Sequence, residues 1–261
     1  MINKENLKKV LDFLEFTHRK EIYKNKILGY TIVVDFAGKG KITYPDGVIV
    51  NDETTSNLTK NENFVVLECV YRLLKLGYKP ECIELEPKWE APHDIGGGGK
   101  ADVLVKDNAG ESFLLIECKT WGKEFDNYWK KTEQDGDQLF FYAVQKRSTK
   151  YLCMYASNWD NDELVRKSNI ISLKDNTATL ESFDEPISFE KANDKSSLFA
   201  AWNITYGKYS FKNGIFEDTC IPYLIEEKGR DISNITEIGH DDIQKKYHEF
   251  TTILRQQSGP S

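Results

Sequence analysis

The stretch from residue 100 to residue 119 places the strongest constraint on the fold of this chain. It reads KADVLVKDNAGESFLLIECK, in which two β-rich segments flank Asp107-Asn108-Ala109-Gly110, residue types that favour a turn. Residues 112–119 hold four consecutive apolar side chains, as a strand buried on both faces does. The pattern predicts an antiparallel hairpin in which 101–106 pairs with 112–119, and the second strand lies inside a sheet.

Helical patterns surround this hairpin. Residues 61–77 repeat apolar side chains at helical spacing and end at a glycine, where helices commonly stop. Residues 124–147 are mostly helical with an interruption at 135–137, and residues 150–157 form another β-rich segment. The order of helix, strands, helix and strand predicts an α/β fold, a mixed central sheet flanked by helices.

We divide the chain of 261 residues into three parts, which suits one large domain with additions. Residues 1–60 are an N-terminal addition with a predicted helix over 3–18 and β-rich segments, one of them over 27–35. Residues 61–175 form the core. Residues 176–261 form a helical C-terminal extension, which ends in an amphipathic helix predicted over 239–256.

Composition excludes several classes of protein. No apolar run approaches the ~20 residues of a membrane helix, and the N-terminus does not resemble a signal peptide, so we expect a cytoplasmic protein with no membrane contact. The five cysteines have no CxxC spacing, which favours reduced, buried thiols over a zinc site. The net charge of −7 argues against strong independent binding to nucleic acid. Residues 151–261 carry 12 basic and 18 acidic side chains, and hold most of this charge.

Two carboxylates are predicted to share one face of the hairpin. Alternate residues of a strand point the same way, so Glu117 and Lys119 lie on one face and the side chain of Cys118 on the other. Depending on the turn, residue 102 faces residue 115 or residue 117, and both registers put Asp102 on the face of Glu117. A three-residue loop would break this parity. Two carboxylates at that spacing predict a Mg²⁺ site, with the carbonyl of Cys118 as a third ligand.

Such a site suits phosphodiester hydrolysis. A metal ion neutralises charge on a phosphate and lowers the pKa of a bound water, and a lysine such as Lys119 orients that water or stabilises the transition state. The alternative is that Glu117 and Lys119 are ordinary polar residues at a strand end, since Glu-x-Lys triplets are common. Charge directly after a buried strand is costly without pairing or function, which favours a site.

These residues resemble the PD-(D/E)xK nuclease superfamily. Asp102 matches its first acid and Glu117-Cys118-Lys119 its E-x-K element, while Ala101 stands where many members have proline. Gln138 and Tyr142 resemble the Q-x-x-x-Y motif of a subset that includes the nuclease domains of type I restriction subunits. Four residues apart, they share a helix face. The alternative is a helix that only packs its aromatic residues, with Gln138 incidental.

The span from about 60 to 175 resembles the N-terminal nuclease domain of type I restriction endonucleases, including those fused to an adenine-N6 methyltransferase. The resemblance implies a restriction-endonuclease-like core and a Mg²⁺-dependent DNA endonuclease of a restriction-modification system, with Mn²⁺ able to substitute. Asp102 and Glu117 would hold the metal, Lys119 would act in catalysis, and Gln138 and Tyr142 would support DNA contact.

The resemblance further implies an accessory acid and protein partners. Glu68, on the preceding helix, resembles the helical glutamate that completes the metal site in many members. Its alternative role is an ion pair with Arg72, four residues on. Motor, methyltransferase or specificity domains or subunits would be partners. Two other functions stay open: a catalytically weak, nuclease-like module that binds DNA and docks such a partner, and an enzyme of the same fold that acts on RNA.

Overall fold

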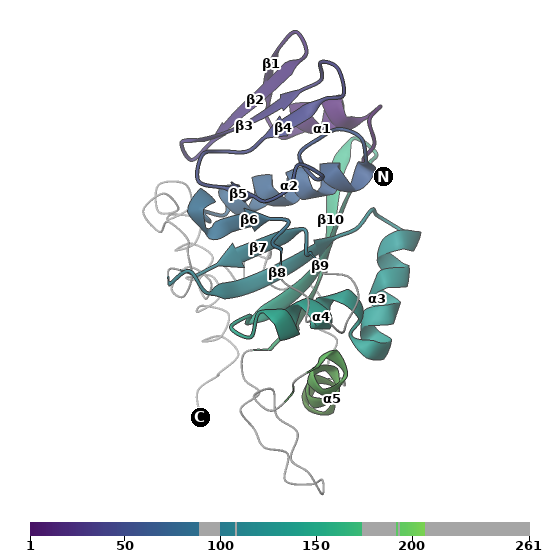
Figure 1. Ribbon diagram of the computed structural model, residues 1–261. Coiled ribbons are helices and arrows are strands. Elements are labelled where there is room, and N and C mark those ends of the chain that lie inside the picture. The colour runs from purple at the N-terminus through teal and green to yellow at the C-terminus, as the bar shows by residue number, and fades with distance from the viewer. Residues whose placement is uncertain (89–99, 108, 174–191, 193, 207–261) are drawn as a thin grey trace, which may run out of the picture.

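The structure is a computed structural model that describes residues 1–88, 100–107, 109–173, 192 and 194–206 (Figure 1). Within these residues the chain is α/β: a four-stranded antiparallel sheet, a mixed six-stranded sheet packed with helices, and a helical C-terminal part. The predicted fold class is therefore confirmed. The helix predicted over 239–256 lies outside the described residues.

The small sheet follows helix α1 (Leu7–Phe13) in the chain. Its strands run in the order β1-β2-β3-β4, with every neighbouring pair antiparallel. The strands are β1 (Thr17–Arg19), β2 (Ile22–Ile27), β3 (Tyr30–Asp35) and β4 (Lys41–Thr43). Two predictions are wrong here. The helix spans Leu7–Phe13 and not 3–18, and the expected strand over 27–35 is split by a turn. Leu28 and Gly29 have φ of 47° and 94°, the conformation of a two-residue hairpin turn.

The large sheet has the strand order β10-β9-β8-β7-β6-β5. Its strands are β5 (Ile49–Val50), β6 (Ile83–Leu85), which follows the 3-10 helix η1 (Pro80–Cys82), β7 (Val103–Lys106), β8 (Ser112–Cys118), β9 (Tyr151–Asp160) and β10 (Glu163–Ser172). Strand β8 lies between β7, to which it is antiparallel, and β9, to which it is parallel. All its residues are buried, which confirms the predicted central strand.

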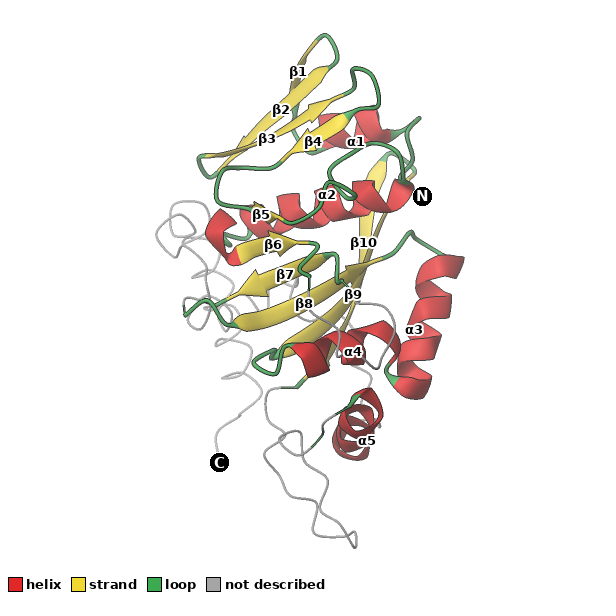
Figure 2. Cartoon of the chain, in the orientation of Figure 1, coloured by secondary structure: helices red, strands yellow, loops and turns green. Residues whose placement is uncertain are grey.

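Helices cover both faces of the large sheet (Figure 2). They are α2 (Asn61–Lys75) on one face, and α3 (Lys123–Asp135), α4 (Asp137–Gln145) and α5 (Lys195–Tyr206) on the other. Leu114 and Ile116 of β8 belong to a core that joins α1, the small sheet and α2, whereas Leu115 belongs to the core under α4. Successive side chains of β8 point to opposite faces of the sheet, so each packs either on the α2 side or on the α4 side.

The hairpin register places Asp102 beside Glu117. Val103 pairs with Ile116, and continuing this register by one residue puts position 102 opposite position 117. A bulge between Val105 and Lys106 absorbs one residue, so the longer connection after β7 leaves the parity intact. The expectation that Asp102 and Glu117 share a face is therefore confirmed.

The predicted break at residues 135–137 is confirmed by Gly136, which separates α3 from α4 with a φ of +80°. A Cβ at this position would lie 2.8 Å from the side chain of Phe140. We expect Gly136→Ala to destabilise the protein by about 2 kcal/mol more than Gly110→Ala, which has a similar φ of +83° but open space around the added Cβ. Urea denaturation of both variants measures the difference. Equal losses would attribute the whole effect to the backbone and none to Phe140.

The described cysteines are buried and free, as predicted: Cys69, Cys82, Cys118 and Cys153. Cys220 lies outside the described residues. In the part of the chain that the structure describes, no helix has both the length and the apolar character that crossing a bilayer requires.

Candidate active site

Lys119 lies at the centre of a buried cluster of charges at the end of β8. Its ammonium Nζ donates to Glu117 Oε1 at 2.7 Å and to Glu62 Oε1 at 3.0 Å. Its backbone N–H donates to the carbonyl of Tyr155 on β9, which extends the strand pairing beyond Cys118. Lys119 is only 6% exposed, so its charge is neutralised by protein carboxylates and not by bulk water.

Asp102 lies directly before β7 and is held against the same end of β8. Its Oδ2 accepts a hydrogen bond of 2.7 Å from the backbone N–H of Cys118. The thiol of Cys118 is buried in the core that α2 covers, on the opposite face, as the strand period predicts. Glu117 Oε2 is buried without a hydrogen-bond partner in the described chain. One carboxylate oxygen of the pair is thus left for a further donor or a cation.

Burial raises the pKa of both carboxyl groups, and neighbouring carboxylates raise both further. Burial raises the pKa of Glu117 to about 7, although the charge of Lys119 lowers it. Burial and then the charge of Glu117 raise the pKa of Asp102 well above its ordinary value. For Lys119, burial lowers the pKa, but the charges of Glu117, Asp102 and Glu62 outweigh burial and leave it raised. Lys119 therefore stays protonated at neutral pH.

Helix α4 carries both Gln138 and Tyr142, and it brings Tyr142 to this cluster. Burial raises the pKa of the Tyr142 phenol, and the charges of Glu117 and Asp102 raise it further, so the phenol lies within electrostatic reach of both carboxylates. Gln138 lies one turn earlier, and its Oε1 is buried without a hydrogen-bond partner in the described chain. The structure thus places both residues of the Q-x-x-x-Y element on the helix that covers the carboxylate pair.

Two residues that sequence reasoning missed also contact Lys119. Glu62, in the first turn of α2, supplies the second carboxylate for its ammonium. The ring of Tyr128 on α3 lies 4.7 Å from Lys119 Nζ, within cation–π range. The position of α3 is set by Thr120, whose backbone N–H and hydroxyl both donate to Glu124. The helix dipole stabilises an acidic residue in the first turn of a helix in any protein. The residue type and position of Glu62 therefore did not mark it as part of this site.

Glu68 lies elsewhere. Its two oxygens accept hydrogen bonds of 2.6 Å from the hydroxyl of Tyr155 and from Nε of Arg166. Tyr155 belongs to the core that α2 covers, whereas Glu117 points to the face that α4 covers. The structure therefore does not bring Glu68 to Asp102 and Glu117. Glu68 forms an ion pair with Arg166 of β10, a partner that the sequence alternative of a pair with Arg72 did not name.

The donor set suits a Mg²⁺ ion held mainly by water and substrate. Among the described residues, no three His, Cys, Asp or Glu side chains are arranged to hold a metal. Mg²⁺ is commonly bound by one or two carboxylates and completes its shell with waters and phosphate oxygens. Asp102 and Glu117, with the unpartnered Glu117 Oε2, meet that requirement. Ligation by Cys118 stays a prediction.

The raised pKa of Glu117 has a consequence for stability. The folded protein holds a proton up to about pH 7 that the unfolded chain releases near 4.5, so the metal-free protein loses stability as pH rises through this window. Relative to wild type, Glu117→Gln should gain about 2 kcal/mol between pH 5.5 and pH 8. Urea denaturation in EDTA measures this difference, with Glu111→Gln in the exposed hairpin loop as control. A pH-independent difference would refute the assigned shift.

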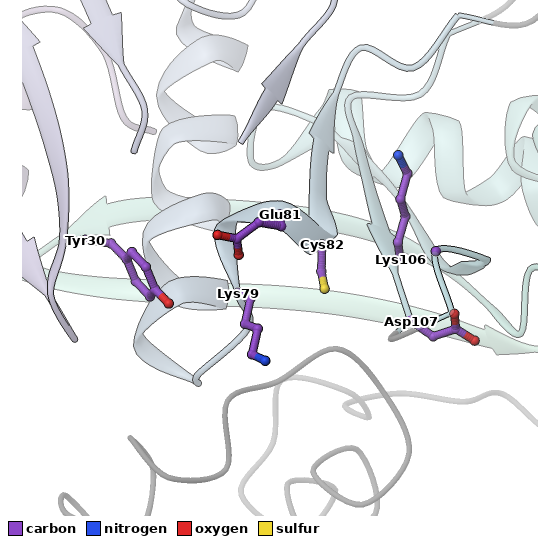
Figure 3. A pocket seen from close by; sticks show the side chains of 7 residues that line it. Tyr30, Lys79, Glu81, Cys82, Lys106 and Asp107 are labelled. Carbon is purple, nitrogen blue, oxygen red and sulfur yellow. The ribbon is translucent and has the colours of Figure 1, made fainter. Parts of the chain in front are cut away.

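A separate hollow of about 590 Å³ lies between the small sheet and the far end of the β6–β7 pair (Figure 3). Its lining includes Tyr30, Lys79, Cys82 and Lys106, and none of the residues around Lys119.

Comparison of the chain with protein-family models and with curated proteins found no match.

Proposed function

We propose that this chain is a Mg²⁺-dependent DNA endonuclease of the PD-(D/E)xK type, acting in a restriction-modification system. One observation carries the proposal: Lys119, Glu117 and Asp102 converge at one end of the central hairpin, with Lys119 Nζ 2.7 Å from Glu117 Oε1. Three charged side chains at the end of a buried strand are costly to maintain, and a hydrolytic site accounts for that cost.

Asp102 and Glu117 would hold the metal, which when bound supplies charge neutralisation at the phosphate and a water of lowered pKa. Lys119 stays protonated, because three carboxylates raise its pKa. Its role is therefore electrostatic: an ammonium that donates to a phosphate oxygen as negative charge builds there. It cannot serve as a general base in that state.

Tyr142 and Gln138 would orient the backbone of the substrate. The phenol of Tyr142 keeps its proton, because burial and the neighbouring carboxylates raise its pKa, so it acts as a hydrogen-bond donor. The amide of Gln138 has both donors and an acceptor. Contacts with phosphate and sugar of this kind fix register without reading sequence. We therefore assign target choice to specificity domains or subunits, and propose motor or methyltransferase domains or subunits as further partners.

Plasmid nicking tests the proposal. We expect wild type to relax supercoiled DNA with Mg²⁺ or Mn²⁺ but not with EDTA, and Asp102→Ala to lower the rate by about 10²- to 10³-fold. The control is Glu111→Gln, which removes an exposed carboxylate from the same hairpin and should cut like wild type. If Asp102→Ala cuts as well as wild type, the assignment fails. Cleavage of a matched RNA but not of DNA would move the chain to the RNA-acting alternative.

A second function, a nuclease-like module that binds DNA and docks a partner without cutting, is favoured by one observation. Lys119 is already paired with two carboxylates, Glu117 and Glu62, as in a purely structural network. This alternative predicts no stabilisation by metal. A ligand that binds only the folded state raises the thermal midpoint by mass action, so an unchanged midpoint in saturating Mn²⁺ would support the docking module.

A further inference from the structure

The outer face of the small sheet is unusually basic for this chain. Along β2 the side chains alternate: Tyr23, Asn25 and Ile27 are buried, while residues 22, 24 and 26 are exposed. The same alternation runs through β3 and β4, where Ile32, Val34 and Ile42 point inward. We call the exposed side the outer face. Its polar side chains are Thr17, Arg19, Lys24, Lys26, Thr31, Asp35, Lys41 and Thr43.

The charge of this segment is opposite to that of the whole chain. Residues 17–43 carry six basic and two acidic side chains, a net charge of +4, in a chain of net charge −7. The two acids are already engaged: Glu21 pairs with Lys8 at 3.0 Å, and Asp35 Oδ1 accepts from the backbone N–H of Ala37. The potential over the outer face is therefore positive.

The basic side chains of the outer face are free to bind an anion, because they form no strong ion pair within the described residues. Lys41 pairs with Glu53 at 3.8 Å, and both side chains are exposed, so the pair is weak. For Arg19, Lys24 and Lys26, no ion pair exists within the described ranges of the chain. Lys24 and Lys26 are two residues apart on one strand, about 7 Å, and each has a threonine opposite it on a neighbouring strand. The hydroxyl of Thr17 donates to the carbonyl of Lys24 at 3.2 Å, so the ammonium groups and the hydroxyl of Thr31 are the side-chain donors that this part of the face offers.

We propose that the outer face binds the phosphate backbone of duplex DNA. Lysine, arginine and threonine are typical donors to phosphate oxygens. The outward positions of β1 to β4 carry no aromatic side chain, so they offer no platform for stacking the bases of a single strand. The choice of DNA as the polyanion rests on the proposed function; the positive face itself does not. This surface is separate from the residues around Lys119 and adds affinity without sequence readout.

Fluorescence anisotropy with a labelled DNA duplex, in EDTA and over a salt series, tests the proposal on the full chain. Each lost phosphate contact lowers the slope of log K against log salt by about 0.9. Lys24→Gln/Lys26→Gln should therefore lower the slope by about two and weaken binding at low salt at least about tenfold. The matched control is Lys4→Gln/Lys146→Gln, which removes two exposed lysines elsewhere and should bind like wild type.

Several results would overturn this inference. One is an unchanged affinity and salt slope for Lys24→Gln/Lys26→Gln. Others are equal affinity of wild type for polyglutamate, or for phosphatidylserine vesicles, under the same conditions, because either makes the face a general anion binder. Failure of the proposed function is distinguishable: if wild type never nicks plasmid but the double variant loses DNA binding, the nuclease assignment fails and the binding face stands.

Discussion

Lys119→Met is expected to lower the rate of DNA cutting by about 10²- to 10³-fold while enlarging the thermal shift that Mn²⁺ produces. The variant removes the ammonium that contacts Glu117 and Glu62 but keeps a side chain of similar length. Loss of one preorganised charge at a developing phosphate anion lowers a rate by about 10²- to 10³-fold. The carboxylates then lack their internal cation, so they repel each other and gain more from a metal ion. Plasmid nicking and thermal unfolding with and without Mn²⁺ measure the two effects.

The opposite directions of these effects separate chemistry from metal binding. Lys130→Met removes an exposed lysine from α3 and serves as control, since it should change neither readout. If Lys119→Met cuts within about threefold of wild type, Lys119 is only structural. If cutting and the Mn²⁺ shift are lost together in a folded protein, Lys119 supports the geometry of the carboxylates, and its separate role in the chemistry is refuted.

Glu68→Gln is expected to cost about 3 kcal/mol of stability without changing the rate of cutting by the folded protein. Glu68 is 1% exposed and holds both the guanidinium of Arg166 and the hydroxyl of Tyr155. Removing one partner of a buried ion pair costs about 3 to 5 kcal/mol, and the lower end applies because the Arg166 side chain is 28% exposed. Urea denaturation at pH 7 measures the loss.

A double variant distinguishes the structural role of Glu68 from the metal role that its sequence position suggested. Glu68→Gln/Arg166→Met removes both charges and should recover part of the stability, because no unpaired cation remains. A Glu68→Gln protein that keeps its stability within about 0.5 kcal/mol but loses both cutting and the Mn²⁺ shift would restore Glu68 as a metal ligand.

Local sequence patterns predicted the helices and strands that have clear runs of apolar residues or clear breaks. The four apolar residues of 113–116 identified the central strand, and the glycine at 136 identified the break between two helices. The N-terminal region was harder, because Leu28 adopts a positive φ that its residue type does not signal. The helix of 3–18 was overestimated because its apolar spacing continues to Leu14, while Phe16 is instead buried in the core beside the first strand.

Local sequence patterns likewise predicted one part of the candidate site and missed the part that depends on tertiary packing. The shared face of Asp102 and Glu117 follows from the two-residue period of strands and the length of one hairpin, both local properties. The contacts of Lys119 with Glu62 and Tyr128 depend on how α2 and α3 approach the end of β8. The pairing of Glu68 with Arg166 joins residues 98 positions apart. No single-sequence pattern carries that tertiary information.

The bulge between Val105 and Lys106 sets which changes of length the hairpin tolerates. Ala109, Gly110 and Glu111 beyond it are exposed, so insertions there should leave Asp102 in place. A deletion of one residue between the bulge and Asp102 would instead turn the aspartate to the opposite face of the sheet, towards α2. Among diverged copies of this chain, length variation should therefore concentrate at residues 107–111 and be absent from 102–105.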